Sequence, residues 1–151
     1  MIIDRSSGSR PAADQRGAAS VELVILVPVL VIMLGLLVAG GRLWFARATV
    51  VEASESAARA ASLARSAGDA RHAGNRAAER VLSTDGLTCG GTGAVAIDVD
   101  AFGVPVGTPA TVTARVTCEV PFSDLSIPGM PGSITVRGNG AAALDTYRAR
   151  S

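Results

Sequence analysis

RGAASVELVILVPVLVIMLGLLVAGG, residues 16–41, is the stretch that decides the fold. Its last nineteen residues, 23–41, carry no charge. A helix of that length covers about 28 Å at a rise of 1.5 Å per residue, and the hydrocarbon core of a bilayer is about 30 Å thick. The stretch therefore predicts a membrane-spanning helix, with the buried core helix of a globular protein as the alternative.

The composition of the whole chain argues against a buried core helix. Charged residues make up 18% of the chain and aromatic residues 3%, which leaves little bulky apolar surface to cover such a helix on every side. A cleaved secretory signal is another alternative, but signal cores usually run about 7 to 15 residues without an acid. This stretch is longer and has Glu22 at its head. We therefore expect a retained, single-pass anchor.

Glu22 is the most informative single residue, because a carboxylate at the edge of an apolar span needs a partner. A charged side chain costs about 2.5 to 3.5 kcal/mol at the centre of a membrane helix and less near its ends. A cut between Gly17 and Ala18 would make Glu22 the fifth residue of the trimmed chain. The new α-amino group would be largely protonated at neutral pH, so it can neutralise Glu22 of its own or a neighbouring chain.

This arrangement resembles the processing site of type IV prepilins and pseudopilins, where a prepilin peptidase cleaves after a glycine on the cytoplasmic side. The chain is most similar to the TadE-like family of the tight-adherence (Tad) pilus system, over RGAASVELVILVPVLVIMLGLLVAGGRLWFARATVVEASESAARAA, residues 16–61. The features that carry the resemblance are the Gly17 and Glu22 spacing, Pro28 within the span, the glycine–arginine pair that ends it, and the alanine-rich continuation.

The resemblance implies a minor pilin or pseudopilin that takes part in pilus assembly and is anchored and assembled through its N-terminal helix. Residues 1–17 would then be a cleaved cytoplasmic leader, and residues 18–41 would span the bacterial cytoplasmic membrane. The C-terminal head would lie outside the cytoplasm or in an extracellular pilus. The implied partners are the membrane, the prepilin peptidase and other pilin-like subunits.

Pro28 interrupts the hydrogen-bond pattern of the expected membrane helix. Proline has no amide hydrogen, so the carbonyl of Val24 loses its partner, and we expect a kink or a loosened turn there. The alternative is simple tolerance, since membrane helices accept proline when neighbouring groups satisfy the freed carbonyl.

Beyond the membrane the helix is expected to continue to about residue 67, as part of a helical stalk over residues 42–82. Small apolar residues spaced three and four apart form one stripe along it: Ala46, Val50, Ala53, Ala57, Ala60, Ala64 and Ala67. Because alanine buries little area, the stripe permits close packing without driving strong association. Gly68 and Gly74 predict fraying or a helix end, with a second helical piece over residues 75–82.

Residues 83–151 predict a small β-rich head. Alternating apolar and polar residues predict strands over 94–100, 110–120 and 133–137, and residues 141–148 are a fourth strand or a short helix. Such a sheet needs a helix or a partner to cover its apolar face. The expected fold class is α+β: a long transmembrane helix continuing into an Ala-rich amphipathic helix, then a small antiparallel sheet, as in pilins.

The two cysteines bear on both stability and topology. A disulfide between Cys89 and Cys118 would close a loop of about 30 residues and stabilise the head by roughly 3 to 4 kcal/mol; two free buried thiols are the alternative. Disulfides persist mainly outside the cytoplasm. Arginines flank the span on both sides, so charge does not decide its orientation. The cysteines and the resemblance predict an extracytoplasmic head.

Signals for catalysis or cofactor binding are weak. His72 is the only histidine and is expected on a solvated helix face. The glycine-rich run 89–93 lacks the Lys-Ser/Thr of a phosphate-binding loop, and Asp98 and Asp100 are expected on a solvated strand face. The net charge is only +1 and the arginines are scattered. We expect no enzyme activity, no cofactor, no metal site and no nucleic-acid partner.

Two other functional classes remain as alternatives. In one, the helix is an uncleaved tether and the head is a binding module that recognises a surface ligand. In the other, the chain is released as a secreted domain by a cut after Gly40 or Gly41, where small residues end the apolar run.

Overall fold

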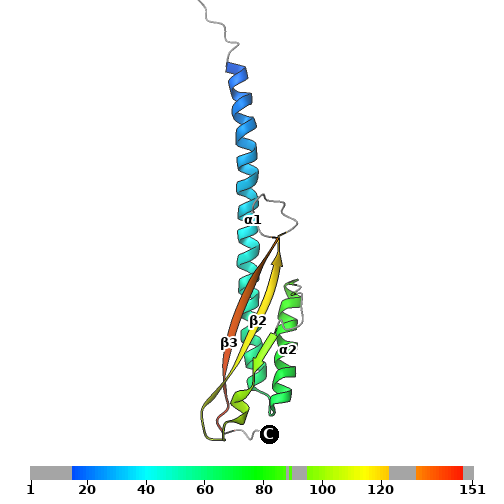
Figure 1. Cartoon of the computed structure of the whole chain (residues 1–151), viewed down its shortest axis with the longest axis vertical. Coiled ribbons are helices and arrows are strands. Elements are labelled where there is room, and N and C mark those ends of the chain that lie inside the picture. The colour runs from blue at the N-terminus through cyan, green and yellow to red at the C-terminus, as the bar shows by residue number, and fades with distance from the viewer. Residues whose placement is uncertain (1–14, 88, 90–94, 123–131, 148–151) are drawn as a thin grey trace, which may run out of the picture. The chain divides into compact units, whose positions relative to one another are not determined.

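The computed structural model describes residues 15–87, 89, 95–122 and 132–147. These form the helices α1 (Gln15–Ser62) and α2 (Ala67–Thr84), the strands β1 (Val95–Asp98), β2 (Ala110–Pro121) and β3 (Ser133–Leu144), and the short 3-10 helix η1 (Asp100–Gly103) (Figure 1). The fold class is α+β, as predicted. The contacts divide the chain into two compact units, Met1–Leu37 and Val38–Ser151.

The second unit is built on an antiparallel sheet in the order β1-β2-β3. The central residue Ala114 pairs with Ile97 on one side and with Gly140 on the other. Burial alternates along β2, as expected for a strand with one covered face. The buried residues are those that the sequence pattern predicted: Val112, Ala114, Val116, Cys118 and Val120.

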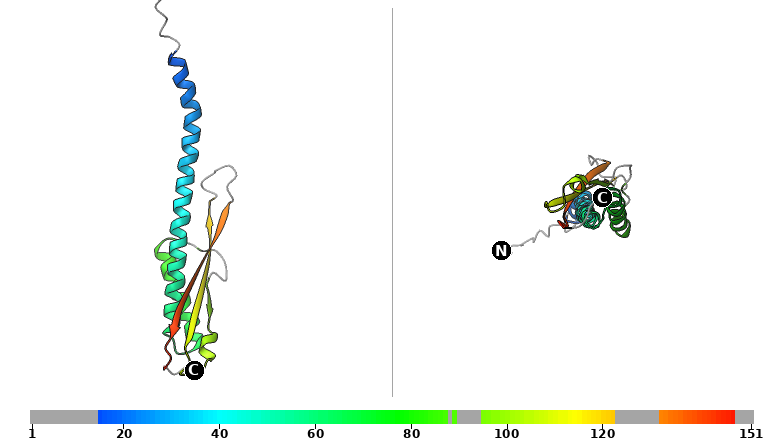
Figure 2. Two further views of the ribbon diagram at one scale, coloured as in Figure 1. Left: turned by 90° about the vertical axis from the view of Figure 1, so that its left-hand side faces the viewer. Right: turned by 90° about the horizontal axis from the view of Figure 1, so that it is seen from below.

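Two helices cover the buried face of this sheet: the part of α1 that belongs to the second unit, and α2 (Figure 2). The core contains mainly small side chains from the helices and valines from the strands. On the predicted alanine stripe, Ala46, Val50, Ala53 and Ala57 are buried, whereas Ala60 and Ala64 are only half-buried. The stripe is therefore used within the chain, against its own sheet.

The connection between the two helices differs from the sequence-based prediction. Helix α1 ends at Ser62, before residue 67, and α2 contains both Gly68 and Gly74. The reason is a cap at Ser66, whose hydroxyl oxygen accepts a hydrogen bond from the Asp69 amide at 3.1 Å. That hydroxyl also donates to the Asp69 carboxylate at 2.9 Å. A serine followed three residues later by an acid is a helix-start signal.

The third strand also differs from the prediction. Strand β3 runs without interruption over Ser133–Leu144, in place of a strand over 133–137 and a separate element over 141–148. The added part of the strand contains Gly138 and Gly140, although glycine usually weakens a strand interior. Both glycines lie on the buried face, where a side chain would overlap the backbone of α1 at Val50 and Ser54. They permit close contact between strand and helix.

The first strand is shorter than expected, and this changes the position of one acidic residue. Strand β1 ends at Asp98, and Asp100 begins η1. The Asp98 carboxylate accepts a hydrogen bond from the Asp100 amide at 3.0 Å, as is common in turns. The prediction that both aspartates share a strand face is therefore wrong for Asp100.

Candidate functional site

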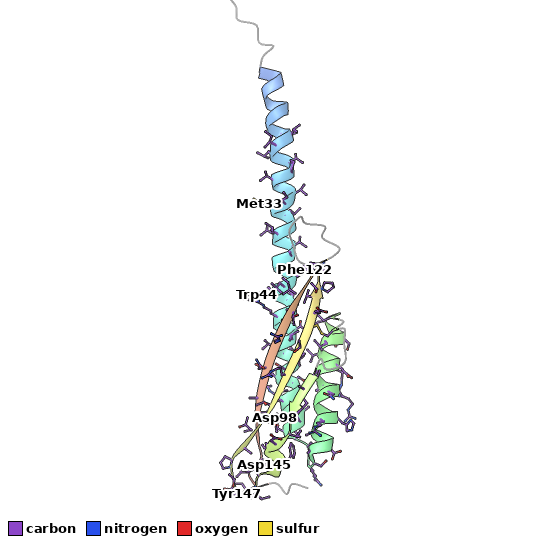
Figure 3. The ribbon with its side chains drawn as sticks, viewed as in Figure 1. Met33, Trp44, Asp98, Phe122, Asp145 and Tyr147 are labelled. Atoms are coloured by element: carbon purple, nitrogen blue, oxygen red, sulfur yellow. A yellow bond between two sulfur atoms is a disulfide. The ribbon has the colours of Figure 1, made fainter. Side chains whose placement is uncertain are left out.

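The first unit presents apolar side chains on every side of a helix. From residue 23 to residue 37, each large apolar side chain is between 49% and 71% exposed, and none of these residues is buried. Met33, which Figure 3 labels, is one of them. A helix that is apolar all round is typical of a membrane span. Among the described residues, α1 has the length and composition needed to cross a membrane, which is compatible with the expected anchor.

The residues of the predicted processing site are described only as helix. Gly17, Ala18 and Glu22 fall within α1, but the side chains before Leu23 lie outside what the structure describes, as do residues 1–14. Cleavage after Gly17 and charge pairing by Glu22 therefore stay predictions. Pro28 lies inside α1, and the kink at this residue also stays a prediction.

Two aromatic residues follow the apolar run and were not singled out in the sequence. Trp44 and Phe45 are 74% and 73% exposed, although aromatic side chains of this size are usually well covered. The exposed arginines Arg42 and Arg47 flank them in the chain. Tryptophan and arginine next to an apolar span are typical of the membrane–water interface. Figure 3 shows Trp44 and Phe122 at one end of the second unit, and Asp145 and Tyr147 at the other.

A cleft of about 530 Å³ lies at this end of the second unit; we call it the Arg42 cleft. Three segments supply its walls: α1, the segment directly after α2 and the end of β2. They contribute Arg42, Phe45, Ala46 and Thr49 from α1, Asp85, Gly86 and Leu87 from the segment directly after α2, and Glu119, Val120 and Pro121 from β2.

Hydrogen bonds hold the walls of the Arg42 cleft in place. The hydroxyl of Thr49, which is 7% exposed, donates to Oδ2 of Asp85 at 2.7 Å and so ties the end of α2 to α1. The hydroxyl of Ser133 donates to Oε1 of Glu119 at 3.3 Å. The residues around the cleft therefore include Arg42, Asp85 and the exposed ring of Phe45. Glu119 also borders it, but alternation along β2 directs its side chain to the face of the sheet opposite to that of Val120.

The predicted disulfide is confirmed. Cys89 and Cys118 are bonded, with an S–S distance of 2.05 Å and a Cα–Cα distance of 4.7 Å. The bond joins the segment after α2 to the central strand β2, and Cys118 is almost fully buried.

The other polar residues singled out in the sequence are not brought together. His72 lies exposed on α2, in a shallow depression with Asp69 and Arg76, whereas Asp98 lies exposed on β1. Among the described residues, no three histidine, cysteine or acidic side chains are grouped in a way that could hold a metal ion.

One comparison with known proteins gave a match, and it lies within α1. A family model described as TadE-like protein matches residues 17–59. The expected resemblance to the TadE-like family is thus confirmed over the apolar segment and most of the remaining part of α1. The match includes neither α2 nor the sheet. Comparisons with curated proteins and with solved structures gave no match.

Proposed function

We propose that the protein is a TadE-like minor pilin or pseudopilin that takes part in assembling a tight-adherence pilus. One observation carries the proposal: the TadE-like match over residues 17–59 coincides with a helix whose residues 23–37 bury no face within the chain. A segment of that kind needs either lipid or other apolar helices around it. An assembly of membrane-anchored helices supplies both.

The proposed mechanism begins with cleavage after Gly17 by a prepilin peptidase at the cytoplasmic face. Cleavage leaves the apolar helix in the membrane and frees the amino group of Ala18. That cation balances the carboxylate of Glu22, in the same chain or in a neighbouring subunit. Because an unpaired carboxylate in this position is costly, the pairing favours one register between adjacent helices.

The proposed topology has a cytoplasmic N-terminus, a single membrane crossing and a head on the outer side. The Cys89–Cys118 disulfide supports this orientation, because structural disulfides are rare in the cytoplasm and common outside it. The head would serve as a folded structural module rather than an enzyme. Its core joins the part of α1 that belongs to the second unit directly to the sheet.

The pilus role is tested in a bacterium that makes the protein, by deleting it and restoring the wild type or Glu22→Ala. We expect the deletion to reduce surface pili and the wild type to restore them. Glu22→Ala should reach the membrane in normal amount but fail to co-purify with other pilin-like subunits. Glu52→Ala is the matched control, because Glu52 is an exposed glutamate of α1 outside the apolar run.

Two results would count against the proposed role. The first is an unchanged number of pili after deletion. The second is normal pili and normal co-purification with Glu22→Ala, which would remove the charge-pairing step.

A further inference from the structure

We propose that the outer edge of β3 binds an extended segment of a partner protein, which adds a strand to the sheet. The segment that fits has apolar side chains on the face toward α1 and an acidic side chain opposite Arg137 on the other face. The proposal concerns the second unit alone, and it depends neither on cleavage after Gly17 nor on pilus assembly. Three features support it: the backbone of β3, the side of α1 next to it and the charge of Arg137.

The two edges of the sheet differ in length and protection. Among the described residues, β3 pairs only with β2, which leaves its outer side without a neighbouring strand (Figure 1). Strand β3 has 12 residues and no proline, and its register with β2 is unbroken from Ser133 to Leu144. Strand β1, at the other edge, has 4 residues and ends in a turn at Asp98. Proteins usually protect sheet edges with short strands, prolines or bulges. The β3 edge has none of these.

The backbone groups on the outer side of β3 form a regular row. The Phe122 amide donates to the Gly132 carbonyl at 2.8 Å, directly beyond the last pair of the register between β2 and β3. In an antiparallel pair, hydrogen-bonded residues alternate with residues whose backbone groups point away from the partner strand. The even-numbered residues of β3 therefore bond to β2, and an extended chain is the partner that matches the outward amides and carbonyls of the others. The outward residues are Ser133, Thr135, Arg137, Asn139, Ala141 and Ala143.

The side of α1 next to this edge has an incompletely covered apolar residue. Val51 is 41% exposed, although it lies on the same side of the helix as Ser54, whose carbonyl lies against Gly140. Successive side chains of a strand point to opposite faces, so an added strand would direct every second side chain toward α1. Apolar side chains at those positions would cover Val51. One face of the partner segment is therefore predicted to be apolar.

Arg137 determines the chemistry of the other face. Its side chain is exposed, and among the described residues it has no hydrogen bond or ion pair. Its backbone points outward, so the residue of an added strand that pairs with it lies on the same face, with the two Cβ atoms about 5 Å apart. A carboxylate at that position is within reach of the guanidinium group. The partner segment is therefore predicted to carry an acid there.

A second copy of the chain does not fit this edge through its own β3. Helix α1 lies directly over β3, because Cβ atoms added at Gly138 and Gly140 would overlap the carbonyls of Val50 and Ser54. If two β3 strands paired, their α1 helices would be about 5 Å apart, which is one strand spacing. Packed helices need about 8 to 10 Å between their axes. The partner segment must therefore carry no helix of its own on that face, as is true of a tail or a linker.

The test uses the full chain in nanodiscs and the synthetic peptide Thr-Val-Thr-Val-Asp-Val-Thr-Val-Thr. This sequence reads the same in both directions, so it presents the same two faces in a parallel or an antiparallel pairing. We expect the peptide to slow hydrogen exchange, measured by NMR, at the outward amides of Thr135, Arg137 and Asn139. A peptide that is N-methylated at its threonines and its aspartate keeps the side chains but loses the pairing amides. It should give no protection.

Variants of the protein separate backbone pairing from charge. Ala141→Pro removes an outward amide and should lower the affinity for the peptide about tenfold or more, because proline cannot donate to an added strand. Arg137→Glu should bind the peptide about three- to tenfold more weakly, and should prefer a peptide with arginine in place of aspartate. Arg76→Glu is the matched control, since Arg76 is an exposed arginine of α2. It should bind as the wild type does. Should Ala141→Pro fail to fold, the N-methylated peptide still tests backbone pairing.

Three results would overturn the proposal. The first is unchanged exchange at the outward amides of β3 in millimolar peptide. The second is equal protection by the N-methylated peptide, or equal affinity of Arg137→Glu for the two charged peptides. The third is a dimer of the wild type that protects the same amides without peptide, which would show that a second copy occupies the edge. The pilus role is tested separately by the deletion, so failure here leaves it standing.

Discussion

Gly140 of β3 lies directly against the main-chain carbonyl of Ser54 in α1. Gly138 lies in the same way against the carbonyl of Val50, one helical turn earlier. Two residues of a strand advance about 6.6 Å, and one turn of a helix advances about 5.4 Å. Because these two lengths are similar, each step from one glycine to the next along β3 matches about one turn of α1. The sheet is therefore joined to α1 backbone to backbone.

Replacing Gly140 with alanine should destabilise the head, because the added Cβ would overlap the Ser54 carbonyl. Overpacking of this kind typically costs about 1 to 3 kcal/mol. The measurement is thermal unfolding of the full chain in nanodiscs, followed by circular dichroism. Gly103→Ala is the control, since a Cβ at Gly103 meets nothing within 4 Å. An unchanged midpoint for Gly140→Ala would contradict the contact.

Thr49→Val should loosen the end of α2, because the 2.7 Å hydrogen bond to Asp85 is lost. We expect a loss of about 1 kcal/mol in unfolding free energy. Hydrogen exchange should become faster at the amides of Asp85 and Leu87. Thr111→Val is the matched control, since Thr111 is an exposed threonine of β2 that does not line the Arg42 cleft. Identical exchange at the end of α2 in both variants would show that the bond does not hold it.

Removing the disulfide should weaken the head strongly. In the chain-entropy model, losing the crosslink between Cys89 and Cys118, which are 29 positions apart, costs about 3 to 4 kcal/mol. The double variant Cys89→Ala/Cys118→Ala should therefore unfold at lower temperature than the wild type, and reductant should affect only the wild type. The topology is checked separately, by alkylating the cysteines of the wild-type protein in a bacterium that makes it. Alkylation of both cysteines without prior reduction would contradict a head outside the cytoplasm.

Trp44 offers a measure of membrane depth, because it is the chain's single tryptophan. Its position after the apolar run predicts that it lies at the membrane–water interface. Lipids brominated near the carbonyl should therefore quench its fluorescence more than lipids brominated near the end of the acyl chain. Stronger quenching by the deeply brominated lipids would show that Trp44 lies inside the hydrocarbon core, and would contradict its predicted position at the interface.

The sequence alone predicted the parts of the molecule that depend on local patterns. The uncharged run 23–41 predicted the apolar helix, and alternation over 110–120 predicted the buried residues of β2. The cysteine pair predicted the disulfide. Each of these patterns depends on residues within one segment or on one pair of residues, and the structure has the helix, the buried strand face and the disulfide that they predict.

The parts that were missed depend on contacts between distant segments. Gly138 and Gly140 look like strand breakers until the helix that packs on them is known. The Arg42 cleft joins residues from α1, α2 and β2, so no single stretch contains it. The end of α1 could have been found, because Ser66 and Asp69 form a recognisable helix-start signal that competed with the continuing alanine pattern.

The most direct test of the account is the intact mass of the mature chain from a bacterium with an active prepilin peptidase. We predict a chain that begins at Ala18, and a Gly17→Val variant that keeps its leader because the larger side chain blocks cleavage. A mature chain that begins at Met1 would leave an uncleaved tether, and one that begins at Gly41 or Arg42 would indicate a secreted domain. Either result would contradict the pilin-like account.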